Sequence, residues 1–267
     1  MTIGFLGVGV MGESILRGVL AAGTSPLLVQ VADRRAERAH EVARQHGVVE
    51  ATPAGLAAAA DLLLVAVKPG DVPDALAEVG PVLRPDAVVV SVAAGLTTAT
   101  LEQLLPPRTP VVRAMPNTPA LVGAGVTAIC PGSHAAREQV QAAAALLATV
   151  GTVVEVAEGQ MDAVTAVSGS GPAYLFLVVE ALVEAGVRAG LGRDLATRLV
   201  LATLDGSARM LAQTGEHPAV LRERVTSPGG TTAAALHRLE AHGLRAAFLD
   251  AVLANRDRAR EIAEGLG

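Results

Sequence analysis

Aromatic residues and cysteine are nearly absent from this chain of 267 residues. Aromatic side chains make up 1% of it and tryptophan does not occur, so a core has to be built from the smaller members of an apolar fraction of 51%. Cys130 is the one cysteine, which excludes an intrachain disulfide and is typical of a reducing compartment. We expect Cys130 to be a small core residue.

Positive charge is also scarce. The net charge is -5 and the pI about 5.7, a balance that argues against nucleic acid or an anionic membrane as a partner. Lysine occurs once, at Lys68, and the other basic residues are arginines, so any reaction that needs a lysine has to use that one.

Long apolar runs are interrupted. The mean hydropathy of +0.45 is high, but uncharged stretches such as Ala114 to Ser133 contain Pro, Gly, Asn and Thr. We therefore expect no clean apolar span of about 20 residues. The first residues, MTIGFLGVGV, lack the pattern of a secretory signal. The expectation is a soluble cytoplasmic protein without a membrane partner.

Short β-branched runs alternate with helical stretches in the first half of the chain. Predicted strands are Ile3–Leu6, Leu28–Ala32, Leu62–Val67, Val88–Val92, Val111–Arg113, Val126–Ile129 and Val153–Val156. Predicted helices are Val10–Ala22, Ala36–Gln45, Val72–Val79, Thr98–Leu105 and Ala135–Ala148. This βαβ rhythm predicts an α/β fold with a doubly wound, Rossmann-type sheet over residues 1–159.

After about Gly159 the strands stop, and residues 160–267 are predicted to form an all-helical second domain. The stretch MDAVTAVSGSGPAYLFLVVEALVEAGVRAG reads as one long helix, or as two helices broken near Gly169–Gly171. Its apolar residues extend around too much of the helix for one small bundle to cover, which predicts a dimer interface.

The stretch GFLGVGVMGES holds a G-x-G-x-x-G pattern made of Gly7, Gly9 and Gly12. It follows the first predicted strand and opens the first predicted helix, which is the context that a dinucleotide-binding turn requires. In that role Gly7 makes the tight turn, Gly9 lets the backbone approach a pyrophosphate, and Gly12 lets the helix pack on the strand. An ordinary glycine-rich turn is the alternative, but the βαβ frame favours the dinucleotide site.

Two signals after the second predicted strand disagree about the cofactor. Asp33 stands where an acid binds the ribose hydroxyls of NAD. Arg34 and Arg35 follow it, and guanidinium groups suit the 2′-phosphate of NADP unless they are only the solvated start of a helix. The pattern slightly favours NADPH, with NAD as the second choice.

Two other loops follow predicted strands. AVKPG ends the strand at Leu62–Val67, and we expect Lys68 near the cofactor because ligands of open α/β sheets lie outside the carboxyl ends of the strands. VRAMPNTPALVG offers Asn117 and Thr118 between two prolines, as a polar contact or as a rigid crossover turn.

A run without charged side chains begins at Val225. VTSPGGTTAA contains no Asp, Glu, Lys, Arg or His and leads into a helical pattern. It is either a well-made helix start or a site built from backbone amides and hydroxyls, because a helix N-terminus binds an anion without Arg or Lys. His237 and Glu240, farther along, are expected to form an exposed polar face and not a metal site.

These stretches together closely resemble pyrroline-5-carboxylate reductase. The resemblance runs in order from Ile3 to about Arg260, and VTSPGGTTAAALHRLE and SGSGPAY are its most specific parts. It implies a Rossmann domain, a helical domain that pairs with a second subunit in a homodimer or a ring of dimers, and reduction of Δ1-pyrroline-5-carboxylate to L-proline with NAD(P)H. Many relatives carry Asn or Ser where this chain has Asp33, so the resemblance leaves NADP and NAD open.

The resemblance also implies roles for single residues. The residues that line the cofactor would be Leu6, Gly7, Val8, Gly9, Val10 and Met11, with Ala66, Val67, Lys68 and Pro69. Arg34 would contact the adenosine ribose, and Val92, Ala93, Ala94 and Asn117 would lie beside the nicotinamide. Thr231 and Thr232 would contact the substrate, with Thr232 as the catalytic donor near the ring nitrogen, and Ser227, Gly229 and Gly230 would complete the uncharged cradle.

Two other functions share this plan. A β-hydroxyacid dehydrogenase or related imine reductase has a similar domain order, but the former usually places a catalytic lysine in the helical domain, and this chain has none after Lys68. A non-catalytic NAD(P)-binding module would not need a polar cradle in the second domain.

Overall fold

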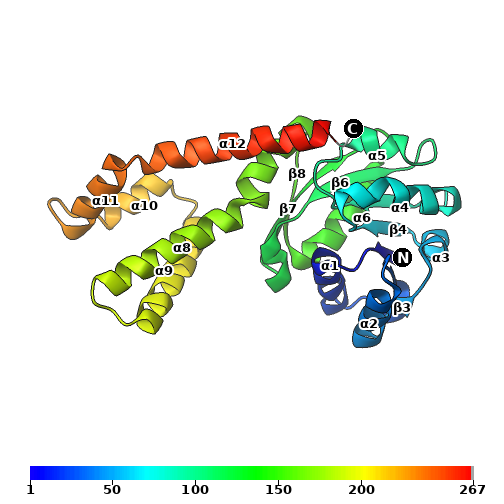
Figure 1. Ribbon diagram of the computed structural model, residues 1–267, viewed down its shortest axis with the longest axis horizontal. Coiled ribbons are helices and arrows are strands. Elements are labelled where there is room, and N and C mark those ends of the chain that lie inside the picture. The colour runs from blue at the N-terminus through cyan, green and yellow to red at the C-terminus, as the bar shows by residue number, and fades with distance from the viewer. Residues whose placement is uncertain (266–267) are drawn as a thin grey trace. The chain divides into compact units, whose positions relative to one another are not determined.

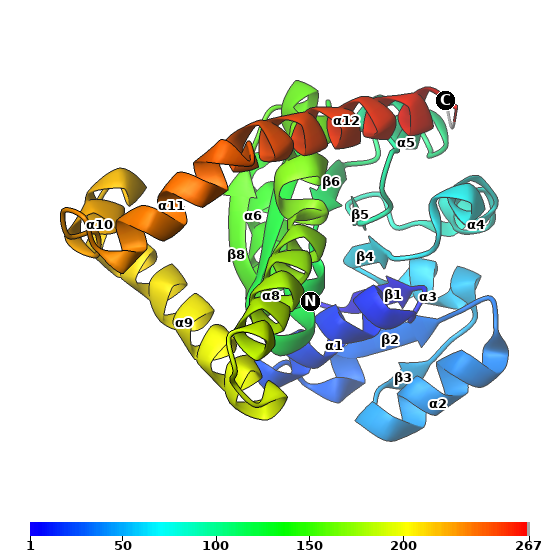
Figure 2. The ribbon, with the colours of Figure 1, turned by 60° about the vertical axis from the view of Figure 1, so that its left-hand side comes forward.

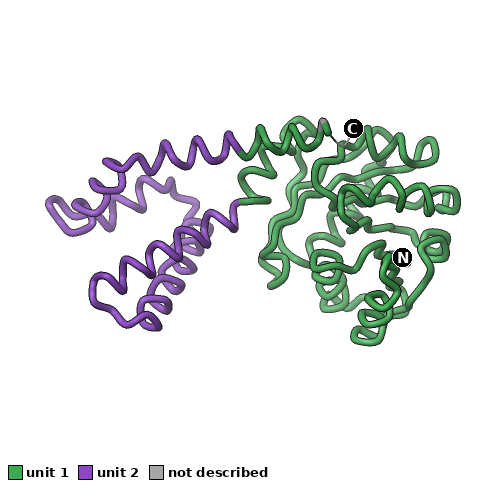
Figure 3. Tube along the Cα trace, viewed as in Figure 1, with its two compact units in different colours: residues 1–170, 255–267 green, residues 171–254 purple. Residues whose placement is uncertain are grey.

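The structure is a computed structural model that describes residues 1–265 (Figure 1). The chain divides into two compact units (Figure 3). One contains Met1–Ser170 together with the chain from Asn255 onward, and the other contains Gly171–Ala254. The predicted boundary near Gly159 marks where the strands end, whereas the division into compact units falls after Ser170, because the first turns of the following helical segment still pack on the sheet.

Within the described residues, eight strands form one sheet in the order β3-β2-β1-β4-β5-β6-β7-β8. The strands are β1 Ile3–Leu6, β2 Val29–Ala32, β3 Val49–Glu50, β4 Leu62–Val65, β5 Val88–Ser91, β6 Val111–Met115, β7 Gly125–Pro131 and β8 Gly151–Glu155. All neighbouring pairs are parallel except β6 and β7, and Ile3 of β1 lies opposite Val29 on one side and Leu62 on the other. The predicted strands all form, and β3 was not predicted.

Helices cover both faces of the sheet. One face packs against α1 Val10–Ala21, α2 Ala36–His46 and α6 Arg137–Leu147, and the other against α3 Pro53–Ala59, α4 Val72–Val79 and α5 Thr98–Gln103. In β4, Leu62 and Leu64 enter the first core while Leu63 and Val65 enter the second, as the two-residue period of a strand requires. Short 3-10 turns lie at Pro26–Leu28, Pro69–Asp71, Gly80–Val82, Thr118–Val122, Ala148–Val150 and Glu158–Gln160. This arrangement confirms the predicted Rossmann-type fold.

The helical part begins with a widened turn. The segment from α7 Met161–Val164 to α8 Gly171–Arg188 is joined by a π-helical turn at Thr165–Gly169, where the Ser170 amide donates to the Thr165 carbonyl at 2.8 Å. The remaining helices are α9 Arg193–Thr214, α10 Pro218–Arg224, α11 Thr231–Ala241 and α12 Leu244–Glu264. α8 and α9 pack side by side (Figure 2). Of the two alternatives, one long helix or two helices broken near Gly169–Gly171, the structure has one helical segment with a π-turn at Thr165–Gly169.

The unit Gly171–Ala254 has almost no core of its own. Its buried hydrophobic side chains are Val183, Ala196 and Leu221. Large apolar side chains on the same helices are exposed, among them Phe176 and Leu177 of α8, each 66% exposed. Apolar surface of this extent marks an interaction site in a folded protein.

The helical segment Glu158–Arg188 is also long and apolar enough, by length and composition alone, to cross a membrane. Its mean hydropathy reaches 1.5 in an 18-residue window of which 17% is buried. The sequence-based expectation of no such apolar span is wrong by this measure. The reason is that the helical segment continues through its small residues, since Gly169 lies in the π-turn and Gly171 and Pro172 begin α8.

Glu158 ties the chain that leaves the last strand to the sheet. Its carboxylate accepts hydrogen bonds from the Thr98 amide at 3.3 Å and the Cys130 thiol at 3.4 Å, and it forms an ion pair with the buried guanidinium of Arg113. Burial alone raises the pKa of the Glu158 carboxyl, but the hydrogen bonds from Thr98 and Arg113 outweigh it and hold that pKa below its usual value.

Cys130 is a buried core residue, as predicted. Burial, reinforced by the neighbouring Glu158 carboxylate, raises the pKa of its thiol to about 12. The thiol therefore stays protonated near neutral pH, and reactivity, which belongs to the thiolate, is suppressed.

We predict that Glu158→Gln lowers the free energy of unfolding by about 1–3 kcal/mol near neutral pH, because Arg113 would remain buried without its counter-charge, while Glu158 itself is one third exposed. The folded-state pKa of Glu158 is lowered, so its contribution is fully present above the unfolded pKa of about 4.3 and is lost as the pH falls through the folded value. The difference in free energy of unfolding between parent and variant, measured with urea, should therefore narrow as the pH falls from about 5 to about 3. Glu155→Gln, which removes the exposed pair with Arg137, serves as the control and should change little. A gap that does not depend on pH would contradict this assignment.

Candidate cofactor and substrate sites

A cavity of about 480 Å³ lies in the sheet unit at the carboxyl ends of β1, β2 and β4. The sheet order reverses between β1 and β4, and such a switch point is where open α/β sheets bind ligands. The cavity brings together nine of the predicted cofactor residues, namely Leu6, Gly7, Gly9, Asp33, Arg34, Arg35, Ala66, Val67 and Lys68. It also includes residues that sequence reasoning missed, namely Pro53, Asp71, Asp74, Ala75 and Glu78.

The glycine loop has the geometry that its pattern predicts. Gly7 has a φ of +95°, and a Cβ there would lie 2.8 Å from the Ala66 backbone, so both the turn and the contact with the β4 loop require glycine. A Cβ on Gly12 would overlap the Gly7 carbonyl, so the first turn of α1 packs directly on the loop. Gly9 differs, because a Cβ there would meet nothing within 4 Å.

The open space at Gly9 is where a ligand can approach the backbone. Gly9 is the N-cap of α1 and supplies no side-chain cap, so the first amides of the helix keep their hydrogen-bonding capacity for an anion. Lys68 lines the same cavity. The residues present thus fit a dinucleotide whose pyrophosphate lies against the start of α1.

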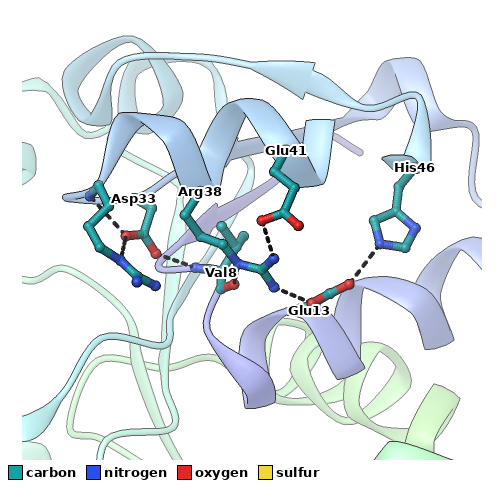
Figure 4. Close-up of polar contacts among 7 residues, drawn as sticks. Val8, Glu13, Asp33, Arg38, Glu41 and His46 are labelled. Carbon is teal, nitrogen blue, oxygen red and sulfur yellow. Dashed lines mark hydrogen bonds and ion pairs between the residues drawn. The ribbon is translucent and has the colours of Figure 1, made fainter. Parts of the chain in front are cut away.

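The backbone of Val8 is hydrogen-bonded at both its N–H and its carbonyl (Figure 4). Its N–H donates to Asp33 Oδ2 at 2.9 Å, and its carbonyl accepts from Arg38 Nε at 3.0 Å. The second carboxylate oxygen of Asp33 accepts from the Arg35 amide at 3.0 Å. Asp33 therefore holds the loop as well as facing the cavity, and Arg38 is a functional neighbour that the sequence did not reveal, because no local pattern links residue 38 to residue 8.

The Arg38 guanidinium is itself fixed by acids. It donates to Glu41 Oε2 at 2.8 Å and forms an ion pair with Glu13, whose other oxygen lies 3.1 Å from His46 Nε2. Burial raises the pKa of the Glu13 carboxyl, but its contacts with His46 and Arg38 prevail and lower it. The His46 side chain is half-buried, because its ring turns in toward Glu13 of the neighbouring helix α1.

The remaining predicted cofactor residues do not line this cavity. They are Val8, Val10, Met11, Gly12, Pro69, Val92, Ala93, Ala94 and Asn117. Val92–Ala94 follow β5 and Asn117 follows β6, so they lie along the same carboxyl edge of the sheet, beyond β4.

Asn117 is buried and its side-chain amide is engaged within the chain. Its Nδ2 donates to the Ser168 carbonyl at 3.1 Å, and its Oδ1 accepts from the Val126 amide at 2.9 Å. These bonds join the loop after β6 to β7 and to the π-turn. Of the two alternatives for this loop, the rigid crossover turn is the one that its hydrogen bonds support.

The uncharged run in the helical unit forms a tight turn before α11. Gly229 has a φ of +67°, and the Gly230 amide donates to the Ser227 carbonyl at 3.0 Å. Gly230 is the N-cap of α11 and provides no side-chain cap. Ser227, Gly229 and Thr231 are exposed, and Gly230 and Thr232 are half-buried. The amides at the start of α11 are therefore available to an anion, as at α1.

Within the described residues, no group of three or more His, Cys, Asp or Glu is placed to hold a metal ion. Of His237 and Glu240, which the sequence analysis weighed as a metal site, His237 is exposed and Glu240 forms an ion pair with Arg245 at 2.8 Å.

Two family models match the chain. Residues 158–262 match pyrroline-5-carboxylate reductase dimerisation, and residues 2–95 match NADP oxidoreductase, coenzyme F420-dependent. The first match contains the helical unit with the exposed apolar side chains, and the second contains the glycine loop and the residues that line the cavity.

Relatives and solved structures of the same family match over nearly the whole length. A pyrroline-5-carboxylate reductase of Corynebacterium melassecola is 44% identical over 98% of both chains. The structure of a pyrroline-5-carboxylate reductase from Coxiella burnetii has a TM-score of 0.93 and 37% identity over 98% of both chains. The Plasmodium falciparum pyrroline carboxylate reductase with NADP bound has a TM-score of 0.87 and 29% identity, again over 98% of both. The chain therefore belongs to the pyrroline-5-carboxylate reductase family, oxidoreductases that act on a CH–NH group.

Proposed function

We propose that this chain reduces Δ1-pyrroline-5-carboxylate to L-proline, the last step of proline biosynthesis, with NADPH as the favoured reductant and NADH as an alternative. The observation that carries the proposal is the cavity at the carboxyl ends of β1, β2 and β4, lined by the glycine loop, Lys68 and Arg34, in a chain of this family. Bound NADPH supplies the hydride that reduces the C=N bond of the substrate.

The cofactor is proposed to lie along the carboxyl edge of the sheet. The amides at the start of α1 and the ammonium group of Lys68 bind the pyrophosphate, since both favour negative charge. Arg34 and Arg35, after β2, bind the 2′-phosphate at one end, and Asp33 faces the ribose. Val92, Ala93 and Ala94, after β5, lie beside the nicotinamide at the other end. Asn117 positions that end of the site through the loop it holds.

The substrate carboxylate is proposed to bind at the start of α11. Ser227, Gly229, Gly230 and the amides of Thr231 and Thr232 provide an anion site without a cation. A cation beside the ring would disfavour the protonated imine, which is the more electrophilic form, so an uncharged site suits this substrate. Thr232 donates a hydrogen bond at the ring nitrogen, where a proton has to be supplied or retained.

The chain is proposed to work as a homodimer or a ring of dimers in the cytoplasm, without a membrane or nucleic acid as partner. The span Glu158–Arg188 lies inside the region that matches the dimerisation model, so a second subunit is the surface proposed to cover its apolar side chains. The net charge of -5 disfavours association with phosphate backbones and anionic lipid.

The function is tested by NADPH oxidation with Δ1-pyrroline-5-carboxylate, repeated with NADH, and by identification of the product as L-proline. Turnover of a β-hydroxyacid with NADP, but none of the imine, would replace this proposal with the dehydrogenase alternative. Tight NADPH binding without turnover of either would replace it with a binding module.

We predict that the double variant Arg34→Ala, Arg35→Ala weakens the binding of NADPH by about ten- to a hundredfold more than the binding of NADH, because charge-assisted contacts to the 2′-phosphate are lost. Dissociation constants of both dinucleotides are the measurement. Arg44→Ala, an exposed arginine of α2 away from the cavity, is the control. Equal weakening of both cofactors would mean that the two arginines are only solvated.

We predict that Thr232→Val, which keeps the shape and removes the hydroxyl, lowers kcat/KM for the imine by about 1–2 kcal/mol, roughly five- to thirtyfold, and that Thr232→Ser recovers most of it. Thr226→Val is a control in the same turn, because the Thr226 hydroxyl donates to the Arg222 carbonyl and has only a structural role. Steady-state kinetics together with thermal melts separate a loss of turnover from a loss of stability. Normal turnover by Thr232→Val with a lowered Tm would mean that the uncharged run before α11 is only a helix start and not a substrate site.

We predict that the chain is a dimer or larger at micromolar concentration in light scattering. Phe176→Glu with Leu177→Glu places two charges on the exposed apolar surface of α8 and should convert it to a monomer. Leu27→Glu changes a side chain in the sheet unit that is 77% exposed, and should leave the assembly intact. A parent chain that is an active monomer would refute the interface.

A further inference from the structure

The cavity carries more acidic than basic side chains. Arg34, Arg35 and Lys68 face it, but so do Asp33 and three acids on the loop and helix after β4, which are Asp71, Asp74 and Glu78. A site that binds only the extra phosphate of NADPH has no need of these three acids, because each one raises the energy of a second anion nearby.

One of these acids reaches across the cavity to a basic residue. Asp71 follows β4, Arg34 follows β2, and Arg34 Nη1 lies 2.9 Å from Asp71 Oδ1. Both side chains remain in solvent, with Arg34 78% and Asp71 37% exposed. The guanidinium proposed to bind the 2′-phosphate thus already has a counter-ion inside the cavity.

The helix that Asp71 precedes does not account for this placement. Asp71 is the N-cap of α4, where an aspartate usually accepts a hydrogen bond from the helix amides, yet its side chain makes no such bond. Asp74 already places a negative charge in the first turn of α4. The Asp71 carboxylate is directed at Arg34 instead.

We infer that Asp71 is a specificity-determining residue, which lowers the preference of this chain for NADPH over NADH by holding Arg34 as an ion pair that a 2′-phosphate has to displace. The inference rests on the cofactor placement proposed above. NADH leaves the pair of Arg34 and Asp71 in place. NADPH exchanges that pair for one with its phosphate and also brings the phosphate near the Asp71 carboxylate.

The matched ligands for the test are adenosine 2′,5′-bisphosphate and adenosine 5′-monophosphate, which differ by the 2′-phosphate alone. Their dissociation constants, with those of NADPH and NADH, are measured by calorimetry on the parent, Asp71→Asn, Asp71→Glu and Asp74→Asn. These are binding readouts and do not depend on turnover.

Asp71→Asn should raise the affinity for the bisphosphate and for NADPH by about two- to fivefold, the range expected for an exposed ion pair, and leave the monophosphate and NADH nearly unchanged. Asp71→Glu keeps the charge and should resemble the parent. Asp74→Asn removes an acid from the same cavity wall, one with no ion-pair partner in the described part of the chain. It should raise the affinity for the bisphosphate and NADPH by less than Asp71→Asn does.

A double-mutant cycle separates competition for Arg34 from plain repulsion of the phosphate. If the two side chains compete as inferred, Arg34→Ala loses more affinity for the bisphosphate in the Asp71→Asn background than in the parent. Additive effects would overturn the inference, and so would an Asp71→Asn variant whose NADPH and NADH affinities change equally, while both leave the proposed function standing. A parent that binds neither dinucleotide would overturn the proposed function and this inference with it.

Discussion

The path of the glycine loop depends on the backbone of one residue, Val8, whose N–H donates to Asp33 and whose carbonyl accepts from Arg38. Glycines leave a loop with wide conformational freedom, and the amides at the start of α1 are a prepared anion site only when that freedom is removed before a ligand arrives. Both restraints come from the chain after β2. The loop is therefore shaped by the pairing of β1 with β2, and Glu13 and Glu41 extend the restraint to α1 and α2 by holding Arg38 in place.

Features that depend on neighbours in sequence could be predicted. The strands β1 and β4 are uninterrupted apolar runs, and Gly7, Gly9 and Gly12 form a short pattern between β1 and α1. The two-residue strand β3 and the alanine-rich helix α3 were missed, because two residues carry no period and alanine suits a helix without marking a face. Arg38 and Asp71 were missed for another reason. Their partners follow different strands, and only the strand order brings them together.

The two units differ in how complete they are. The sheet unit has apolar cores on both faces, whereas Gly171–Ala254 buries three hydrophobic side chains. An apolar helix such as α8 carries the same composition whether lipid, its own chain or another subunit covers it, so composition alone did not separate these environments. The match of this region to a dimerisation family identifies the kind of surface involved.

The scarcity of lysine has a practical consequence at the cavity. Lys68 carries the one side-chain amine of the chain, and it lines the space proposed for the dinucleotide. Apart from the chain terminus, an amine-selective reagent has one place to react. The rate at which such a reagent labels Lys68 therefore measures how much of the cavity is occupied, and no residue has to be introduced for this purpose.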